Sequence, residues 1–374
     1  MHPDASVTPW LWGLLPDDPD VLRRWGREFE VPANSPFSLL ATPIGEDCAG
    51  GVQFASFERA EQLLANDGEI RWIDALEVGE RLKALRSDRA SWLGPALTGQ
   101  WSLAGAQAKM ALRRVDGRWG ETSGVEPTTH ILKPAIMLED CELNEHLCLA
   151  AARMAGLPTA HSQVLEFGDQ IALVVERYDR IEVAGRLRRV HQEDLIQALG
   201  FHPSQKYQAD GGPGVAQIGE LFSKQLSGDR AEDAAKRFAD ALAWNWIIGG
   251  TDAHAKNYSL LLSGRDVRLA PLYDIASILP YPDVYLPKLK MAMKLGGRYD
   301  IRAHSRDTWV KVASELKLNA DTVVERVQEL ATVAPTAFRE ASAAPSLSTF
   351  IGEFSGRLCA AVADRAADCL RVLS

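Results

Sequence analysis

The sequence predicts an α+β fold of two lobes, a small α/β N-lobe followed by a mostly helical C-lobe. Its 374 residues exceed the length of one average domain. Strand-like segments and one helix fill the stretch from about residue 99 to 180, and helical periodicity dominates after it. We therefore expect three regions: an N-terminal remnant with a helical subdomain at 1–98, the N-lobe at 99–180 and the C-lobe at 181–374.

The N-terminal region is expected to be helical after a start rich in Pro, Gly and Asp. Apolar residues at helical spacing, including Val21, Trp25 and Phe29, predict a helix over residues 19–30. Leucines recur through residues 56–95 and predict further helix there. This region looks too small to form a domain alone.

The N-lobe is expected to begin with a β-hairpin. Residues 110–115 form a strand-like segment, and Asp116-Gly117 after it is a strong two-residue turn signal. Residues 129–134 predict another short strand. A second hairpin is predicted from residues 163–167 and 171–176.

One helix is expected between these strands. Leu143, Leu147 and Ala151 make an apolar stripe, Asp140 stands where it can cap the start, and Gly156 ends the pattern. In the C-lobe the pattern predicts helices at 191–199, 215–226, 237–248 and beyond 308, with two short strands at 258–262 and 267–270.

Composition excludes several classes of protein. A net charge of -9 is unsuited to broad DNA binding by the protein's own surface, although a basic patch or a DNA-binding partner stays open. Five cysteines without a CxxC pair favour a reducing compartment over a disulfide framework. No apolar run is long enough for a membrane span and no signal peptide is visible, so we expect a cytoplasmic protein.

The chemistry is expected to centre on Asp252, Asn257 and Asp274. Asp252 and Asn257 are five positions apart, after an apolar helix and Gly249-Gly250 and before a strand. In kinase catalytic loops an Asp at this spacing is the base and the Asn binds metal. Asp274 follows the next hairpin, where a second magnesium ligand belongs. The combination predicts ATP-dependent phosphoryl transfer by a protein-kinase-like fold, although the Asp and Asn alone are as consistent with turn capping.

His254 lies between these residues and raises the alternative of a metal hydrolase. The other histidines nearby in sequence, such as His191 and His202, are scattered among polar residues rather than clustered. A zinc site therefore has little support.

The N-lobe offers groups for a nucleotide. Lys133 ends an apolar strand and is the candidate cation for the phosphates, with Glu145 or Glu142 as its partner. Residues 102–107 take the place of a phosphate-covering loop; they contain Gly105 but no GxGxxG, and an inert loop is the alternative. Residues 176–178 close the N-lobe, where backbone groups can meet adenine or simply link the lobes.

Long motifs resemble the HipA family, serine/threonine protein kinases that are toxins of bacterial toxin–antitoxin modules. They occur in the family's order from about Leu15 to the C-terminus: SLAGAQ (102–107), TTHILK (128–133), NE (144–145), VERYDR (175–180), QED (192–194), KYQADGGPG (206–214), TDAHAKN (251–257) and LYDI (272–275).

The resemblance implies roles for single residues. It makes Asp252 the catalytic base, Asn257 and Asp274 the Mg²⁺ ligands, and Lys133 the ATP lysine. Further ATP-binding positions implied are Glu176 and Tyr178 at the adenine hinge, Ser102, Gly105, Ala106 and Gln107 in the loop, and His254 and Lys256. Ser102 matches the serine whose autophosphorylation inactivates family kinases.

The resemblance also implies partners. Family members phosphorylate aminoacyl-tRNA synthetases, which halts translation and causes growth arrest or persistence. A small helix-turn-helix antitoxin, HipB-like, neutralises them, and DNA is bound only indirectly through it.

One departure concerns the start of the chain. The motif LLPDDP at 14–19 lies well inside longer members, after a β-rich segment, so we expect this chain to be a short form without that segment. A small third protein then supplies it. Two alternatives stay open: a small-molecule or lipid kinase, and a non-catalytic co-repressor scaffold.

Overall fold

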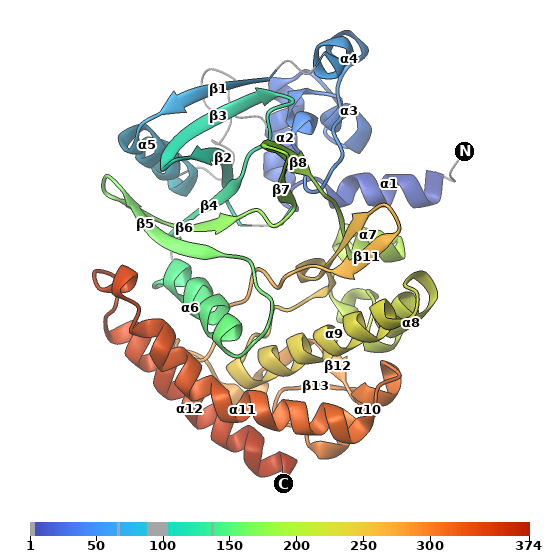
Figure 1. Cartoon of the computed structure of the whole chain (residues 1–374), viewed down its shortest axis with the longest axis vertical. Helices are drawn as coiled ribbons and strands as arrows, with labels where there is room; N and C mark the ends of the chain where they lie inside the picture. Colours follow the sequence, from blue (N-terminus) through green and yellow to red (C-terminus); the bar gives the residue numbers. More distant parts are fainter. Residues whose placement is uncertain (1–3, 66–67, 88–103, 106, 136–137) are drawn as a thin grey trace.

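An antiparallel sheet forms the centre of the N-lobe in the computed structural model, which describes residues 4–65, 68–87, 104–105, 107–135 and 138–374 (Figure 1). Its order is β1-β3-β2-β4-β6-β5. The strands are β1 (Gly68–Ile73), β2 (Met110–Val115), β3 (Arg118–Gly124), β4 (His130–Pro134), β5 (Ser162–Phe167) and β6 (Gln170–Glu176). Both expected hairpins are confirmed. Asp116 and Gly117 have φ of 48° and 79°, as the mirror-image turns favoured in hairpins require.

Helix α6 (Cys141–Met154) lies between this sheet and the C-lobe helices, in contact with β5, β6 and α11 (Figure 1). It is buried on both sides, and even Asn144 and Glu145 are almost inaccessible. The expected helix is confirmed, but the expected cap is wrong. Asp140 has φ 48° and its side chain makes no capping hydrogen bond, because the chain enters the helix in a left-handed conformation.

The N-terminal region packs against the sheet. It contains α1 (Asp4–Gly13), α2 (Pro19–Glu28), α3 (Pro36–Leu40), α4 (Phe57–Leu64) and α5 (Ala75–Ser87). Trp25 and Leu39 share one hydrophobic core with Leu112 and Leu132 of the sheet. The predicted regions 1–98 and 99–180 are therefore joined by a common core.

Helix was expected throughout 56–95, and this is wrong at residues 68–73. These residues form β1, which pairs along its whole length with β3. Cross-strand contacts explain the difference, since the Arg118 guanidinium lies 4.4 Å from the centre of the Trp72 ring.

The C-lobe is mainly helical, with the apolar core of the lobe between α9 and α11 (Figure 1). Its main helices are α7 (Leu195–Leu199), α8 (Val215–Gln225), α9 (Asp229–Ile248), α10 (Arg306–Glu315), α11 (Ala320–Ser342) and α12 (Glu353–Leu373). Short strands are β7 (Arg180–Val183), β8 (Arg186–Arg189), β9 (His191–Asp194), β10 (Ser259–Ser263), β11 (Asp266–Leu269), β12 (Lys290–Leu295) and β13 (Arg298–Asp300).

The helix expected at 191–199 is only half correct. Residues 191–194 form β9, which pairs with β10, and the helix starts after Asp194. The Asp194 carboxylate caps it by accepting a hydrogen bond from the Gln197 N–H at 2.8 Å. All five cysteines are free, and no helix in the described part of the chain is both long and apolar enough to cross a bilayer.

A buried ion cluster ties the N-terminal region to the end of the sheet. The Asp47 carboxylate accepts hydrogen bonds from Arg177 at 3.2 Å, Arg180 at 2.8 Å, Arg189 at 3.1 Å and the Thr128 hydroxyl at 2.6 Å. Burial alone would raise the pKa of Asp47, but the three guanidinium groups outweigh it and hold that pKa well below its usual range.

Candidate active site

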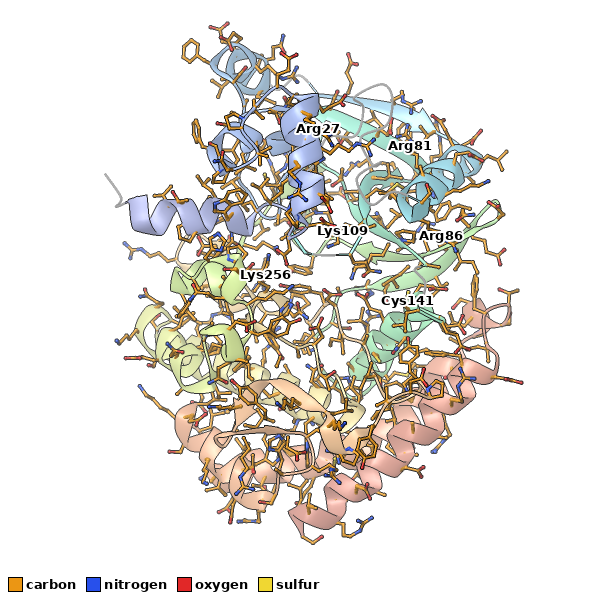
Figure 2. The ribbon with its side chains drawn as sticks, turned by 180° about the vertical axis from the view of Figure 1, so that it is seen from behind. Arg27, Arg81, Arg86, Lys109, Cys141 and Lys256 are labelled. Atoms are coloured by element: carbon orange, nitrogen blue, oxygen red, sulfur yellow. The ribbon has the colours of Figure 1, made fainter. Side chains whose placement is uncertain are left out.

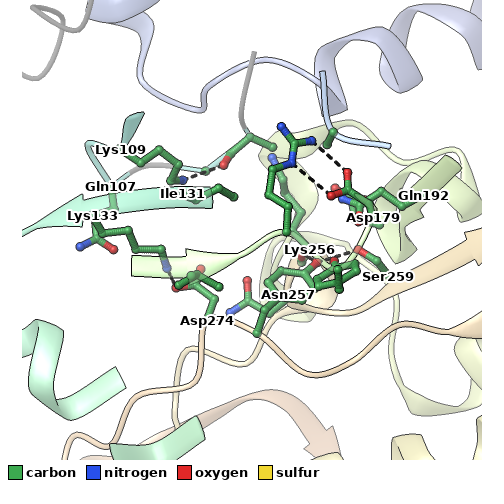
Figure 3. Close-up of a pocket in the computed structure, with 18 of the residues that line it drawn as sticks. Gln107, Lys109, Ile131, Lys133, Asp179, Gln192, Lys256, Asn257, Ser259 and Asp274 are labelled. Atoms are coloured by element: carbon green, nitrogen blue, oxygen red, sulfur yellow. Dashed lines mark hydrogen bonds and ion pairs between the residues drawn. The ribbon is translucent and has the colours of Figure 1, made fainter. Parts of the chain in front are cut away.

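A cavity of about 320 Å³ lies between the N-lobe sheet and the C-lobe (Figure 3). Most of the residues selected from the sequence line it: Gly105, Gln107, Lys133, Glu145, Glu176, Tyr178, Asp252, His254, Lys256, Asn257 and Asp274. Ser102 and Ala106 lie outside the described residues. Side chains that come from positions as far apart as 105 and 274 therefore meet around one space.

Lys133 stands at the centre of an ion-pair triad. From β4 its Nζ donates to both carboxylate oxygens of Glu145, at 2.8 and 2.9 Å, and to Asp274 Oδ1 at 2.8 Å. Burial alone would lower the pKa of Lys133, but the Asp274 and Glu145 carboxylates outweigh it and raise that pKa. Of the two glutamates considered as partners, Glu145 makes the contact.

Asp274 and Asn257 face the same part of the cavity. In Figure 3 the Asn257 amide points toward the Asp274 carboxylate. The Lys133 ammonium lowers the pKa of Asp274 to about 2, so Asp274 is ionised at neutral pH. Asp274 has φ 55°, a left-handed conformation that Asp tolerates better than most residues.

The loop carrying Asp252 depends on two glycines. Gly249 ends α9 with φ 70°, and a Cβ on Gly250 would meet Asn245 Oδ1 at 2.2 Å. The loop is closed by the Asn257 side-chain N–H, which donates to the Asp252 carbonyl at 3.0 Å. The sequence from Gly249 to Asn257 therefore fixes where Asp252 emerges.

Asp252 itself is exposed, and its carboxylate accepts a hydrogen bond from the Tyr207 hydroxyl. The Tyr207 ring meets His254 edge-on, with 4.9 Å between ring centres. Inside the loop, His254 Nδ1 is buried without a hydrogen-bond partner in the structure.

The β4–β6 side of the cavity carries apolar side chains. Ile131 and Val175 are paired across these strands and both line the cavity. Tyr178 follows β6 and its ring lies 5.7 Å from that of Tyr273. The expected hinge residues Glu176 and Tyr178 therefore line the cavity next to these apolar side chains.

Several charged residues that line the cavity were given no role from the sequence: Asp17, Lys109, Arg177, Asp179, Asp194 and Lys206. The Lys109 Nζ donates to the Ala104 carbonyl at 2.7 Å, and burial together with the Lys133 ammonium lowers its pKa to about 8. Lys109 and Lys256 both lie at the junction of the lobes (Figure 2). Lys109 was detectable, since it ends the small-residue stretch that begins at Ser102.

The donor atoms fit a magnesium ion better than a zinc ion. Among the described residues no three His, Cys, Asp or Glu side chains gather in a way that could hold a metal. Asn257 and Asp274 offer hard oxygen ligands, which Mg²⁺ combines with water and substrate phosphate oxygens.

Comparison with known proteins supports one family. Residues 101–338 match the HipA-like C-terminal domain, and residues 1–55 match the HipA N-terminal domain. The chain is 35% identical over 331 residues to "Putative kinase Y4mE" of Sinorhizobium fredii, covering 86% of this chain and 76% of that protein. It is 31% identical over 310 residues to "Serine/threonine-protein kinase toxin HipA" of Shewanella oneidensis, covering 79% and 68%.

The fold agrees with these matches. A solved structure of HipA from Shewanella oneidensis MR-1, in complex with HipB and operator DNA, superposes with a TM-score of 0.83 and 25% identity. The superposition covers 98% of this chain and 86% of that one. The two-lobed, kinase-like α+β fold expected from the sequence is confirmed, and the chain belongs to the HipA family of serine/threonine-protein kinases.

Proposed function

We propose that this chain is the toxin of a toxin–antitoxin pair and phosphorylates serine or threonine in a protein at the expense of ATP. The observation that carries this is the meeting of Lys133, Asp252, Asn257 and Asp274 around one cavity. Phosphoryl transfer needs these parts and few others, namely a base, oxygen ligands for metal and a cation on the phosphates.

In this proposal Asp252 is the catalytic base. It accepts the proton of the substrate hydroxyl, whose oxygen bonds to the γ-phosphorus while the bond to the bridging oxygen breaks and ADP leaves. Asp252 suits this role because it is ionisable, exposed at the mouth of the cavity and already accepts a hydrogen bond from the Tyr207 hydroxyl.

The phosphates are held by cations and backbone. Lys133, Lys109 and Lys256 line the cavity and supply positive charge, and Gly105 and Gln107 of the covering loop expected at 102–107 line it as well. Asn257 and Asp274 would hold Mg²⁺, which when bound neutralises charge on the phosphates. His254 lines the cavity and would contact the nucleotide. Glu176 and Tyr178 would border adenine.

The proposed target is an aminoacyl-tRNA synthetase, so that phosphorylation arrests translation and growth in the cytoplasm. The proposed partner is a HipB-like helix-turn-helix antitoxin, through which the chain meets DNA, as the HipA–HipB–operator complex suggests. A small third protein is proposed as a further partner.

Incubation with radiolabelled ATP and a bacterial lysate tests this proposal. The wild-type chain is expected to label at least one protein band, and Lys133→Met is expected to abolish labelling because the triad with Glu145 and Asp274 is lost. Lys311→Met, exposed on α10, is the matched control and should label like wild type. If only lipids or small molecules carry the label, the protein is a small-molecule or lipid kinase instead. Equal growth on expression of wild type and Lys133→Met would favour the scaffold.

Self-inactivation is proposed at Ser102. After incubation with Mg–ATP, the intact mass of the chain is expected to rise by one phosphate, and the modified peptide should contain Ser102. Ser102→Ala should stay unmodified and keep its activity for longer, since the covering loop is no longer altered. Unchanged mass of the wild-type chain would remove this part of the proposal.

A further inference from the structure

Asp17 reaches the cavity from the N-terminal region, in the motif LLPDDP. Its carboxylate accepts hydrogen bonds from two lysines of the C-lobe, Lys256 at 2.5 Å and Lys206 at 3.1 Å. Lys256 belongs to the same short loop as Asp252 and Asn257, and its side chain is only 4% exposed. Asp17 thus pairs with a lysine whose side chain is almost inaccessible to solvent.

The backbone of the same segment is joined to the phosphate-covering loop. The Asp17 N–H donates to the Gly105 carbonyl at 3.2 Å, and Pro16 forms a parallel β-bridge with Gly105. Gly105 has φ 110°, and a Cβ there would meet the Lys109 Nζ at 2.6 Å. One residue therefore contacts the covering loop through its backbone and the catalytic loop through its side chain.

The segment before Asp17 is anchored on the C-lobe as well. The Trp10 indole N–H donates to Glu193 at 2.9 Å, and the Gln197 side chain donates to the Trp10 carbonyl at 3.1 Å. Gly13 lines the cavity, and a Cβ there would meet Gln197 at 2.4 Å. These contacts fix the position of Asp17 independently of its ion pairs.

We infer that Asp17 is a positioning residue of the kinase site, which holds the Lys256 ammonium and the Gly105 backbone in place where both line the nucleotide cavity. The inference rests on the proposed function and extends it, since it makes the N-terminal region part of the ATP site. A single carboxylate between two ammonium groups leaves one net positive charge to face the phosphates, and it keeps the two lysines from repelling each other.

Without the carboxylate, Lys206, which is 20% exposed, can turn to solvent, and Lys256 loses its fixed position. Asp17→Asn is therefore expected to weaken Mg–ATP binding to the full chain by about tenfold or more, in calorimetric titration carried out below the melting temperature of each variant. Asp17→Glu keeps the charge and should recover part of the affinity, which a role in folding alone would not produce.

Asp18→Asn is the matched control, with the same change of charge one position away. Asp18 Oδ1 accepts from the Asp20 N–H at 2.9 Å as the cap of α2, and Asn caps equally well. The inference would be overturned if Asp17→Asn bound Mg–ATP as tightly as wild type or more tightly, or if Asp18→Asn weakened binding equally. The proposed function would stand in each of these cases. If Asp17→Asn does not fold, weaker binding by a folded Asp17→Glu supports the inference and unchanged binding overturns it. No Mg–ATP binding by wild type would overturn both.

Discussion

Asp252→Asn is expected to slow phosphoryl transfer by roughly a hundredfold to ten-thousandfold, the range that a positioned general base contributes. Asn keeps the shape and can still accept the Tyr207 hydrogen bond, but it cannot take the proton of the substrate hydroxyl. Nucleotide binding should persist, since the proposed phosphate cations and metal ligands are untouched. The rate of label transfer and the affinity for Mg–ATP measure the two effects separately.

The folded state should be insensitive to this change, because Asp252 is exposed. Asp307→Asn is a suitable control, since Asp307 is also exposed and lies on α10 away from the cavity. If Asp252→Asn transfers phosphate as fast as Asp307→Asn, Asp252 is not the base and the proposed mechanism is wrong.

Asp47→Asn is expected to have the largest effect on stability, a loss of about 3–5 kcal/mol in the free energy of unfolding, as when one partner of a buried ion pair is removed. The reason is that the side chains of Arg177 and Arg180 are only 2% and 1% exposed. Without the Asp47 carboxylate, these buried guanidinium groups would stay charged but would have one negative partner fewer. Equilibrium unfolding in urea measures the loss. In the wild type this stabilisation is present at neutral pH and is lost as pH falls below the usual aspartate pKa of about 3.9, because the pKa of Asp47 is lowered on folding.

Glu46→Gln provides the comparison. Glu46 is just as buried and adjacent in sequence, but its ion-pair partner Arg59 is 41% exposed and can turn to water. A smaller loss is therefore expected. Equal losses in the two variants would show that burial of the carboxylate, rather than the arginine cluster, determines the cost.

Local patterns were sufficient for most of the proposed catalytic residues. Asp252, Asn257 and the hairpin before Asp274 all lie within one short stretch of chain. The local sequence therefore indicates that these three side chains lie close together. Lys133 was also predictable, and its partner was narrowed to Glu145 or Glu142, since β4 and α6 are adjacent along the chain.

The residues that were missed act over long separations. Asp17 and Lys256 are 239 positions apart, and nothing near either residue indicates the other. Asp47 was passed over for the same reason, because its arginines follow more than 100 residues later. β1 and β9 were missed because their strand conformation comes from pairing with β3 and β10 rather than from an alternating pattern of their own.

The triad around Lys133 makes metal loading a competition between two cations for one carboxylate. Asp274 Oδ1 is already paired with Lys133, so a divalent ion bound by Asp274 would repel the nearby ammonium group and weaken that pair. Under the proposed roles, the weakened pair would let the lysine turn toward the phosphates that arrive with the metal. Metal and nucleotide should therefore bind cooperatively, and the net affinity is a small difference between two competing sets of ion pairs. Small changes in the positions of Lys133, Glu145 or Asp274 would therefore change how tightly the site binds metal and nucleotide.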